Sequence, residues 1–261
     1  MTVITSHQAG LPHLDIHTLS EDWALAQALD STWQALADSL NMPAAAWRDA
    51  SGKRMYGAVT ALTTWFDLQT PLAEDAIFTA ETALIAIRKP HALSETRFIA
   101  GGQAKAVVRL LTTFVRRDLA GSNKKLSKVR DVWTAEDHAP EVIDALLEQH
   151  HLAKSAPVDA PEAMQHPVVQ IRDFNAAGLF YFKNFVAVAK AAEWCANRAA
   201  PPRLNAARAC YYFANVDDGE VIHARVDRQG DATTTVLEAA TGQRLMLSRA
   251  TTPLVQITVQ P

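Results

Sequence analysis

The chain has 261 residues, of which 49% are hydrophobic, so it can fill one large core or two modest ones. Its formal net charge of −3 excludes an overall basic field that would draw it to nucleic acid or anionic lipid. Its two cysteines, Cys195 and Cys210, fit neither a disulfide framework nor a zinc motif. The sequence shows neither an apolar run long enough to span a membrane nor a secretory signal, so we expect a cytoplasmic protein.

The first half of the chain predicts one long helix followed by strands. Apolar residues recur at helical spacing from Trp23 to Leu40, and Ser20 is a suitable N-cap. Asn41 and Pro43 end this pattern. Segments rich in β-branched and aromatic residues follow, separated by turn signals, which predicts an α+β fold with an antiparallel sheet. These segments are residues 56–66, 76–87, 95–99 and 104–115.

The same order of elements returns in the second half. A short helix at 140–151 and an Ala/Pro-rich stretch at 156–161 come first, and a long helix is predicted at 178–197. Predicted strands lie at 168–171, 207–215, 220–227, 232–239, 244–248 and 254–259. This internal repeat predicts a first module over 1–133, a linker with a short helix over 134–166, and a second module over 167–261. Two unrelated α+β domains are the alternative.

Five segments, in this order along the chain, resemble a known family. They are SEDWALAQALDSTW from Ser20, GKRMYGAV around Tyr56, TTFVRRDLAGSNKKL from Thr112, DFNAAGLFYFKNF from Asp173 and RACYYFANVDDG from Arg208. The fourth segment resembles the strand-to-helix junction of hot-dog thioesterases. The five together are similar to the leinamycin-type bifunctional acyltransferase/decarboxylase family of polyketide biosynthesis. The resemblance implies a tandem double hot-dog fold, in which each module is an antiparallel sheet wrapped around one long helix.

The resemblance also implies an activity and its partners. The expected enzyme decarboxylates malonyl- or methylmalonyl-CoA and loads the remaining acyl group on an acyl carrier protein. Acyl-CoA is then a substrate and phosphopantetheine belongs to the carrier protein, so we expect no cofactor of the chain's own, no metal, no nucleic acid and no membrane. Unpaired sheet edges are compatible with a homodimer. The alternatives are an acyl-CoA or acyl-ACP thioesterase and a non-catalytic acyl-binding hot-dog protein.

Three residues are the expected catalytic groups. Tyr56 matches the family's catalytic tyrosine, and its phenol can donate a proton or hydrogen bond to an enolate. Asn175 lies where a strand turns into a helix, and it can add a donor to the unpaired N–H groups that hold a thioester oxygen there. Asp173 can orient its neighbours or act as the base of a hydrolytic relative. The structural alternatives are a strand tyrosine and two helix-capping side chains.

Four further residues are expected to bind substrate. Gly178 is expected to open the second long helix, and Ser20 opens the first. Arg116 and Asn123 lie in the densest basic stretch of the chain, which also holds Arg117, Lys124, Lys125 and Lys128. Such a cluster can dock phosphates or an acidic carrier protein by charge, although most charge runs are solvated surface.

Overall fold

One sheet of 11 strands organises the molecule in a computed structural model that describes residues 2–16, 18–119, 122–130, 132, 136–198 and 205–252. Its order is β1-β3-β4-β5-β2-β8-β11-β10-β9-β7, with β6 paired to β5. The strands of the first half are β1 (Thr2–Gln8), β2 (Tyr56–Phe66), β3 (Ile77–Arg88), β4 (His91–Ala100), β5 (Gln103–Arg117) and β6 (Leu126–Lys128). Those of the second half are β7 (Glu162–Pro167), β8 (Ala207–Tyr212), β9 (Val221–Gln229), β10 (Ala232–Ala239) and β11 (Arg244–Thr251).

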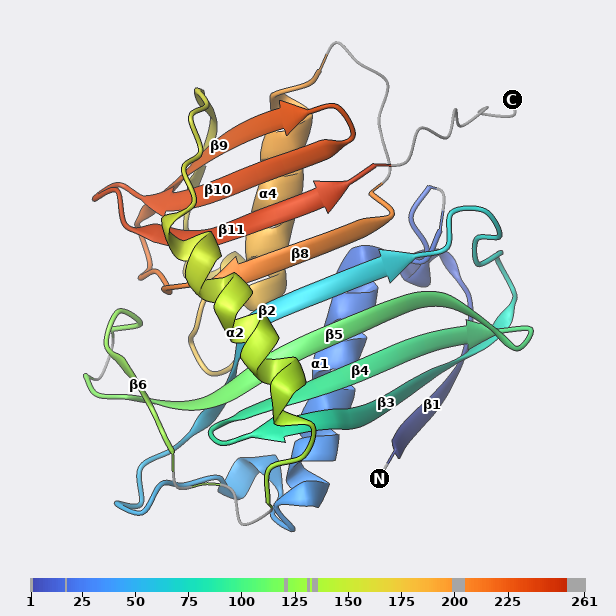
Figure 1. Cartoon of the computed structure of the whole chain (residues 1–261), viewed down its shortest axis with the longest axis vertical. Coiled ribbons are helices and arrows are strands. Elements are labelled where there is room, and N and C mark those ends of the chain that lie inside the picture. Colours follow the sequence, from blue (N-terminus) through green and yellow to red (C-terminus); the bar gives the residue numbers. More distant parts are fainter. Residues whose placement is uncertain are drawn as a thin grey trace.

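Helices cover both faces of this sheet. The long helices α1 (Glu21–Ser39) and α4 (Phe182–Cys195) lie side by side on one face, and α2 (Pro140–Ser155) crosses the other (Figure 1). The main core cluster contains buried residues of α1, α4 and strands from both halves. A smaller cluster lies under α2. Since the main cluster is continuous, the two predicted modules share one core. Single helical turns, or little more, occur at Leu11–His13, Ala44–Ala46 and Gln170–Asp173, the last of which is α3. Within the described residues, no helix is long and apolar enough to cross a membrane.

The first long helix forms as the sequence predicts. The Ser20 hydroxyl accepts a hydrogen bond from the Trp23 N–H at 3.4 Å, which caps the first turn. Ala24, Leu25 and Ala28 are fully buried along its apolar stripe. Asn41, in the left-handed region at φ 49°, turns the chain away after the helix. The N-cap and the end of this helix are therefore confirmed.

The entry into the second module differs from the prediction. The strand expected at 168–171 is wrong, because β7 lies at Glu162–Pro167 and pairs with β9. The next residues form the short helix α3, whose first free N–H, that of Val169, is bound by the Asp173 carboxylate at 2.9 Å. The second module therefore begins inside the stretch that we assigned to the linker. Strand β1 was not predicted, and the strand expected at 254–259 lies outside the described residues.

The two modules meet at the central pair of strands, β2 and β8. They pair antiparallel from Ala61 opposite Tyr211 to Trp65 opposite Ala207. Beyond this stretch, the first residues of β2 pair only with β5, and Tyr212 of β8 pairs only with β11. The seam between the modules thus opens at the end where β2 begins and β8 ends.

Candidate functional site

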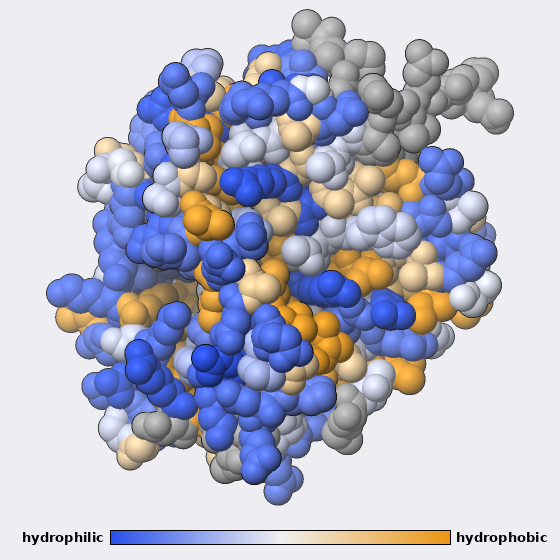
Figure 2. Space-filling view, viewed as in Figure 1, coloured by the Kyte–Doolittle hydropathy of each residue, from blue (hydrophilic) through white to orange (hydrophobic). Residues whose placement is uncertain are grey.

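A pocket of about 430 Å³ lies where β2 and β8 part. One wall is formed by residues 57–60 of β2 and another by residues 212–215 of and after β8. Helices on both faces of the sheet line it, α1 and α4 on one side and α2 on the other. The pocket therefore crosses the sheet at the seam. Figure 2 shows the α2 face hollowed beside that helix, with apolar side chains in the hollow.

The lining of the pocket changes from charged to apolar. Three exposed lysines stand at its rim: Lys124 of the β5–β6 connection, Lys128 of β6 and Lys154 of α2. Its inner part is lined by Leu29 and Trp33 of α1 and by Phe182 and Phe185 of α4. This combination suits a ligand with an anionic end and an apolar end. Among the described residues, no three His, Cys, Asp or Glu side chains gather to hold a metal ion.

Tyr56 does not line this pocket, and it lies beside the lining strand residues among arginines. It is half-buried at the start of β2, next to the lining residue Gly57, and the guanidinium carbons of Arg54 and Arg117 lie 5.6 and 5.8 Å from its ring centroid. Tyr56 pairs with Val115 of β5. Because side chains alternate along a strand, Arg117 shares the face of Tyr56, whereas Arg116 does not.

Arg117 joins three of the predicted site residues. Its guanidinium donates to the Asn123 Oδ1 at 2.8 Å and to the Ala177 carbonyl at 2.7 Å. Gly178 packs against the same group, since a Cβ there would lie 3.4 Å from its Nη2 atom. The buried Asn123 lines the pocket and donates to the Val216 carbonyl at 3.0 Å. The structure therefore brings Tyr56, Asn123 and Gly178 together around Arg117.

Asn175 presents an amide donor to the pocket. Its Oδ1 accepts hydrogen bonds from the Ala177 and Leu179 N–H groups, at 3.0 and 3.1 Å, which holds the side chain in one orientation. Asn175 also lines the pocket, and its Nδ2 makes no hydrogen bond to any described residue. A carboxamide held in this way can donate to an oxygen that acquires negative charge.

The start of α4 adds backbone donors at the same place. The expectation that Gly178 opens this helix is wrong, because the helix begins at Phe182 and Gly178, at φ 68°, closes a tight turn on the Asn175 carbonyl. No side chain caps α4 at Tyr181. The Asn184 N–H of its first turn donates to the Tyr181 carbonyl at 2.8 Å, which leaves the N–H groups of Phe182 and Lys183 without a partner inside the helix. Tyr181 and Phe182 line the pocket, so the N-terminus of α4 lies beside it, and a helix N-terminus favours negative charge.

Asp173 does not line the pocket. Its carboxylate is buried and accepts hydrogen bonds from Arg172 and the Val169 N–H, while His166 lies 3.2 Å away. Burial raises the pKa of Asp173, but these hydrogen bonds outweigh burial and lower the pKa to about 2. Its backbone carbonyl accepts from the Asn184 amide at 2.9 Å. Asp173 thus holds the junction before α4, and its role as a base stays a prediction.

Ser20 and Arg116 lie apart from this group. Ser20 caps the far end of α1, about 20 Å from Trp33 by the rise of a helix. Arg116 pairs with Asp49 and, at 3.4 Å, with Asp118. Their binding roles stay predictions.

Sequence reasoning did not single out Arg117 or His150, a residue of α2 that lines the pocket. The signal available for Arg117 was the alternation of side chains along β5, which places Arg117 on the same face of the sheet as Tyr56.

Comparisons with known proteins place the fold. No family model matches the sequence, and no curated protein matches it either. An acyl-ACP thioesterase from Bacteroides thetaiotaomicron VPI-5482 is similar in structure at a TM-score of 0.66 and 8% identity, over 97% of this chain and 98% of that chain. A 12:0-ACP thioesterase from Umbellularia californica is similar at a TM-score of 0.70 and 9% identity, over 97% of each chain. The predicted tandem double hot-dog fold is confirmed over nearly the whole chain. The leinamycin-type family itself is not among these similarities.

Proposed function

We propose that this chain is an enzyme that cleaves acyl thioesters of coenzyme A or of an acyl carrier protein. The observation that carries the proposal is the pocket at the seam, which joins a lysine rim to an apolar interior. Lys128 and Lys154 would bind the phosphate of a pantetheine arm, and the side chains of α1 and α4 would enclose the acyl chain.

The thioester carbonyl would lie between these two parts. Attack on a thioester places negative charge on its carbonyl oxygen. The Asn175 Nδ2 and the first-turn N–H groups of α4 are donors at that point of the pocket. Since the turn at 175–179 holds the Asn175 side chain before any ligand arrives, and the helix fixes its own N–H groups, these donors would stabilise the charge without rearrangement.

Hydrolysis is the reaction that we propose first. The whole-chain structural likeness to two ACP thioesterases supports it. Hydrolysis also requires a group that accepts a proton from the attacking water.

Acyl transfer with decarboxylation is the second candidate, and the surroundings of Tyr56 favour it. Two guanidinium groups lie against its ring, so an enolate formed by loss of CO₂ from a malonyl thioester would be stabilised there. The phenol would then protonate that enolate. For this reaction, Tyr56→Phe would remove the proton donor and keep the ring.

The test uses intact-mass analysis of a holo acyl carrier protein incubated with this protein and malonyl-, methylmalonyl- or a saturated acyl-CoA. Free acid and free thiol, with the carrier unchanged, support hydrolysis. An acetyl or propionyl carrier, lost in Tyr56→Phe, supports decarboxylating transfer, and a malonyl carrier supports transfer alone. If no thioester is cleaved by the wild-type protein, the proposal is wrong, and an acyl-binding protein is what remains.

A further inference from the structure

We propose that His150, on the helix that connects the modules, is the general base of the thioester cleavage. The inference rests on the proposed function and names the group that accepts the proton in it. His150 lines the seam pocket from α2, together with Lys154 one turn further along the same helix. It lies on the face of the sheet opposite to α1 and α4, so base and apolar acyl site lie at opposite ends of one pocket.

The hydrogen bonds of the ring determine its tautomer. The Nε2 atom lies 2.8 Å from the carbonyl oxygen of Tyr212, and a carbonyl oxygen only accepts. Nε2 therefore carries the hydrogen, and the Nδ1 atom of the neutral ring carries the lone pair. In the described part of the chain, Nδ1 makes no hydrogen bond. A base with one nitrogen anchored and the other unoccupied is the arrangement that general-base catalysis by histidine requires.

Burial, together with the cations around it, keeps the His150 ring neutral. Burial lowers the pKa of His150, the bond to the Tyr212 carbonyl opposes this, and Lys128, Lys154 and His151 lower it further. His91 of β4 also faces it, with its own pKa lowered to about 4 by burial and by Lys128, His150 and Arg88. The unprotonated, proton-accepting form is therefore the one present near neutral pH.

Packing holds the ring in place. Phe213 lies 4.9 Å from it between ring centroids, and Tyr211 lies 6.3 Å away. Phe213 itself lines the pocket, so the imidazole ring packs between the aromatic wall of the pocket and the backbone of its own helix, α2. A side chain that loses little freedom on reaction is a better base than a mobile one.

The proposed step conserves atoms and protons. A water oxygen forms a bond to the thioester carbonyl carbon while Nδ1 of His150 takes one of its protons. The carbon–sulfur bond then breaks, and the thiolate takes that proton back from the imidazolium. The products are a carboxylic acid and a free thiol, and the histidine returns to its neutral form.

The test compares His150→Gln with His151→Gln. Glutamine keeps a donor for the Tyr212 carbonyl and lacks a base, whereas His151 is exposed and does not line the pocket. We expect kcat to fall by about 10² to 10⁴ in His150→Gln, with unchanged binding of a non-cleavable thioether analogue of acyl-CoA. The wild-type rate should also fall at acid pH, below the ordinary pKa of histidine, as Nδ1 becomes protonated, and this dependence should vanish in His150→Gln. His151→Gln should keep the rate near neutral pH and the fall of the rate at acid pH, with that fall moved slightly to higher pH because His151 lowers the pKa of His150.

Three results overturn the inference, and they are distinguishable. If the wild-type protein cleaves a thioester and His150→Gln cleaves it equally fast with the same pH profile, His150 is not the base and the proposed function stands. If the wild-type protein cleaves no thioester and does not bind the thioether analogue, the proposed function fails together with the inference. A fall in rate matched by an equal fall in analogue binding assigns His150 to binding and likewise overturns its role as base.

Discussion

The two ends of the seam between the modules occupy equivalent places in the repeat and differ in what fills them. Because β2 and β8 run antiparallel, the start of α4 lies at one end of the seam and the start of α1 at the other. The α4 end holds the open pocket of about 430 Å³. The α1 end keeps a cavity of only about 60 Å³ beside a cluster of buried charges.

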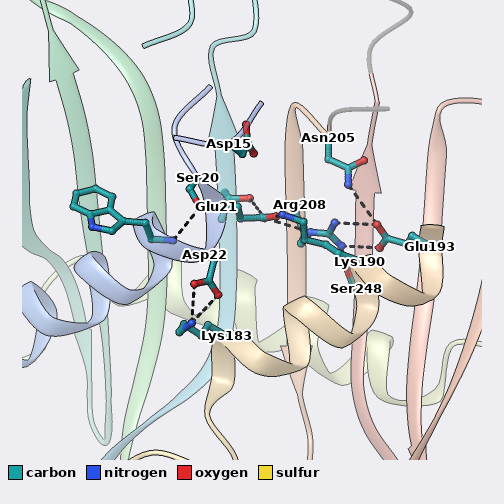
Figure 3. Close-up of polar contacts among 12 residues, drawn as sticks. Asp15, Ser20, Glu21, Asp22, Lys183, Lys190, Glu193, Asn205, Arg208 and Ser248 are labelled. Atoms are coloured by element: carbon teal, nitrogen blue, oxygen red, sulfur yellow. Dashed lines mark hydrogen bonds and ion pairs between the residues drawn. The ribbon is translucent and has the colours of Figure 1, made fainter. Parts of the chain in front are cut away.

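That cluster ties one module to the other. Figure 3 shows Arg208 of β8 between Glu21 of α1 and Glu193 of α4. The Arg208 side chain is fully buried and donates to both carboxylate oxygens of Glu193, at 2.7 and 3.0 Å, while its Nε lies 3.3 Å from Glu21. Lys190 reaches the other Glu21 oxygen at 3.3 Å. The four charged groups of this cluster are therefore paired with one another.

The two ends of the seam differ in whether their polar groups are available to a ligand or are used to join the two modules. At the open end, the Asn175 amide and the α4 N-terminus have donors to offer, and lysines stand at the rim. At the closed end, Ser20 and Glu21 occupy the corresponding positions, and they cap a helix and pair with cations. We therefore assign ligand binding to the open end, and we assign the joining of the modules to the closed end.

The largest expected effect is on the free energy of unfolding, from removing the Arg208 cation at the closed end. Arg208→Met should lower the free energy of unfolding by about 3–5 kcal/mol, because it leaves Glu21 and Glu193 buried without their cation. Urea denaturation measures this, with Arg225→Met as the control. The Arg225 pair with Glu238, at 3.4 Å, is partly exposed and should contribute no more than about 1 kcal/mol. Equal losses in the two variants would contradict the structural role of the cluster.

The next largest effect is expected on kcat, from removing the Asn175 amide at the open end. Asn175→Ala should lower kcat by about 10² to 10³ by removing one donor to the oxyanion, and it should leave acyl-CoA binding nearly unchanged. Steady-state kinetics with the best acyl-CoA measures kcat and KM separately. The matched control is Asn205→Ala at the closed end, where the amide lies 3.4 Å from Glu193. An unchanged kcat in Asn175→Ala would remove the oxyanion site from this end.

A smaller effect concerns the junction that positions Asn175. The pKa of Asp173 is lowered to about 2 from its ordinary 3.8. Its charge therefore stabilises the fold above about pH 4, and this contribution disappears as the pH falls towards 2. Asp173→Asn should cost about 2 kcal/mol at pH 7, and the difference from the wild type should shrink below pH 4. A difference that is the same at pH 7 and pH 2.5 would show that its charge is not what matters.

The sequence predicts local structure better than it predicts the site. The bounds of β2, Tyr56–Phe66, match the prediction because alternation and turn signals are local. The sequence could not show which of Arg116 and Arg117 lies beside Tyr56, because the partner of a strand residue depends on register, which local patterns do not contain. His150 was missed for a similar reason. Which face of the sheet a connecting helix crosses is decided by tertiary packing.

The central claim, that the acyl thioester occupies the open end of the seam, is tested most directly by blocking that end. Ala58 is half-buried in β2 and lines the pocket, and Ala207 is half-buried in β8 at the other end. Binding of a thioether analogue of acyl-CoA, measured by calorimetry, should weaken more than about tenfold in Ala58→Trp and stay unchanged in Ala207→Trp. Equal affinity in Ala58→Trp and the wild type would contradict the account, and so would a loss confined to Ala207→Trp.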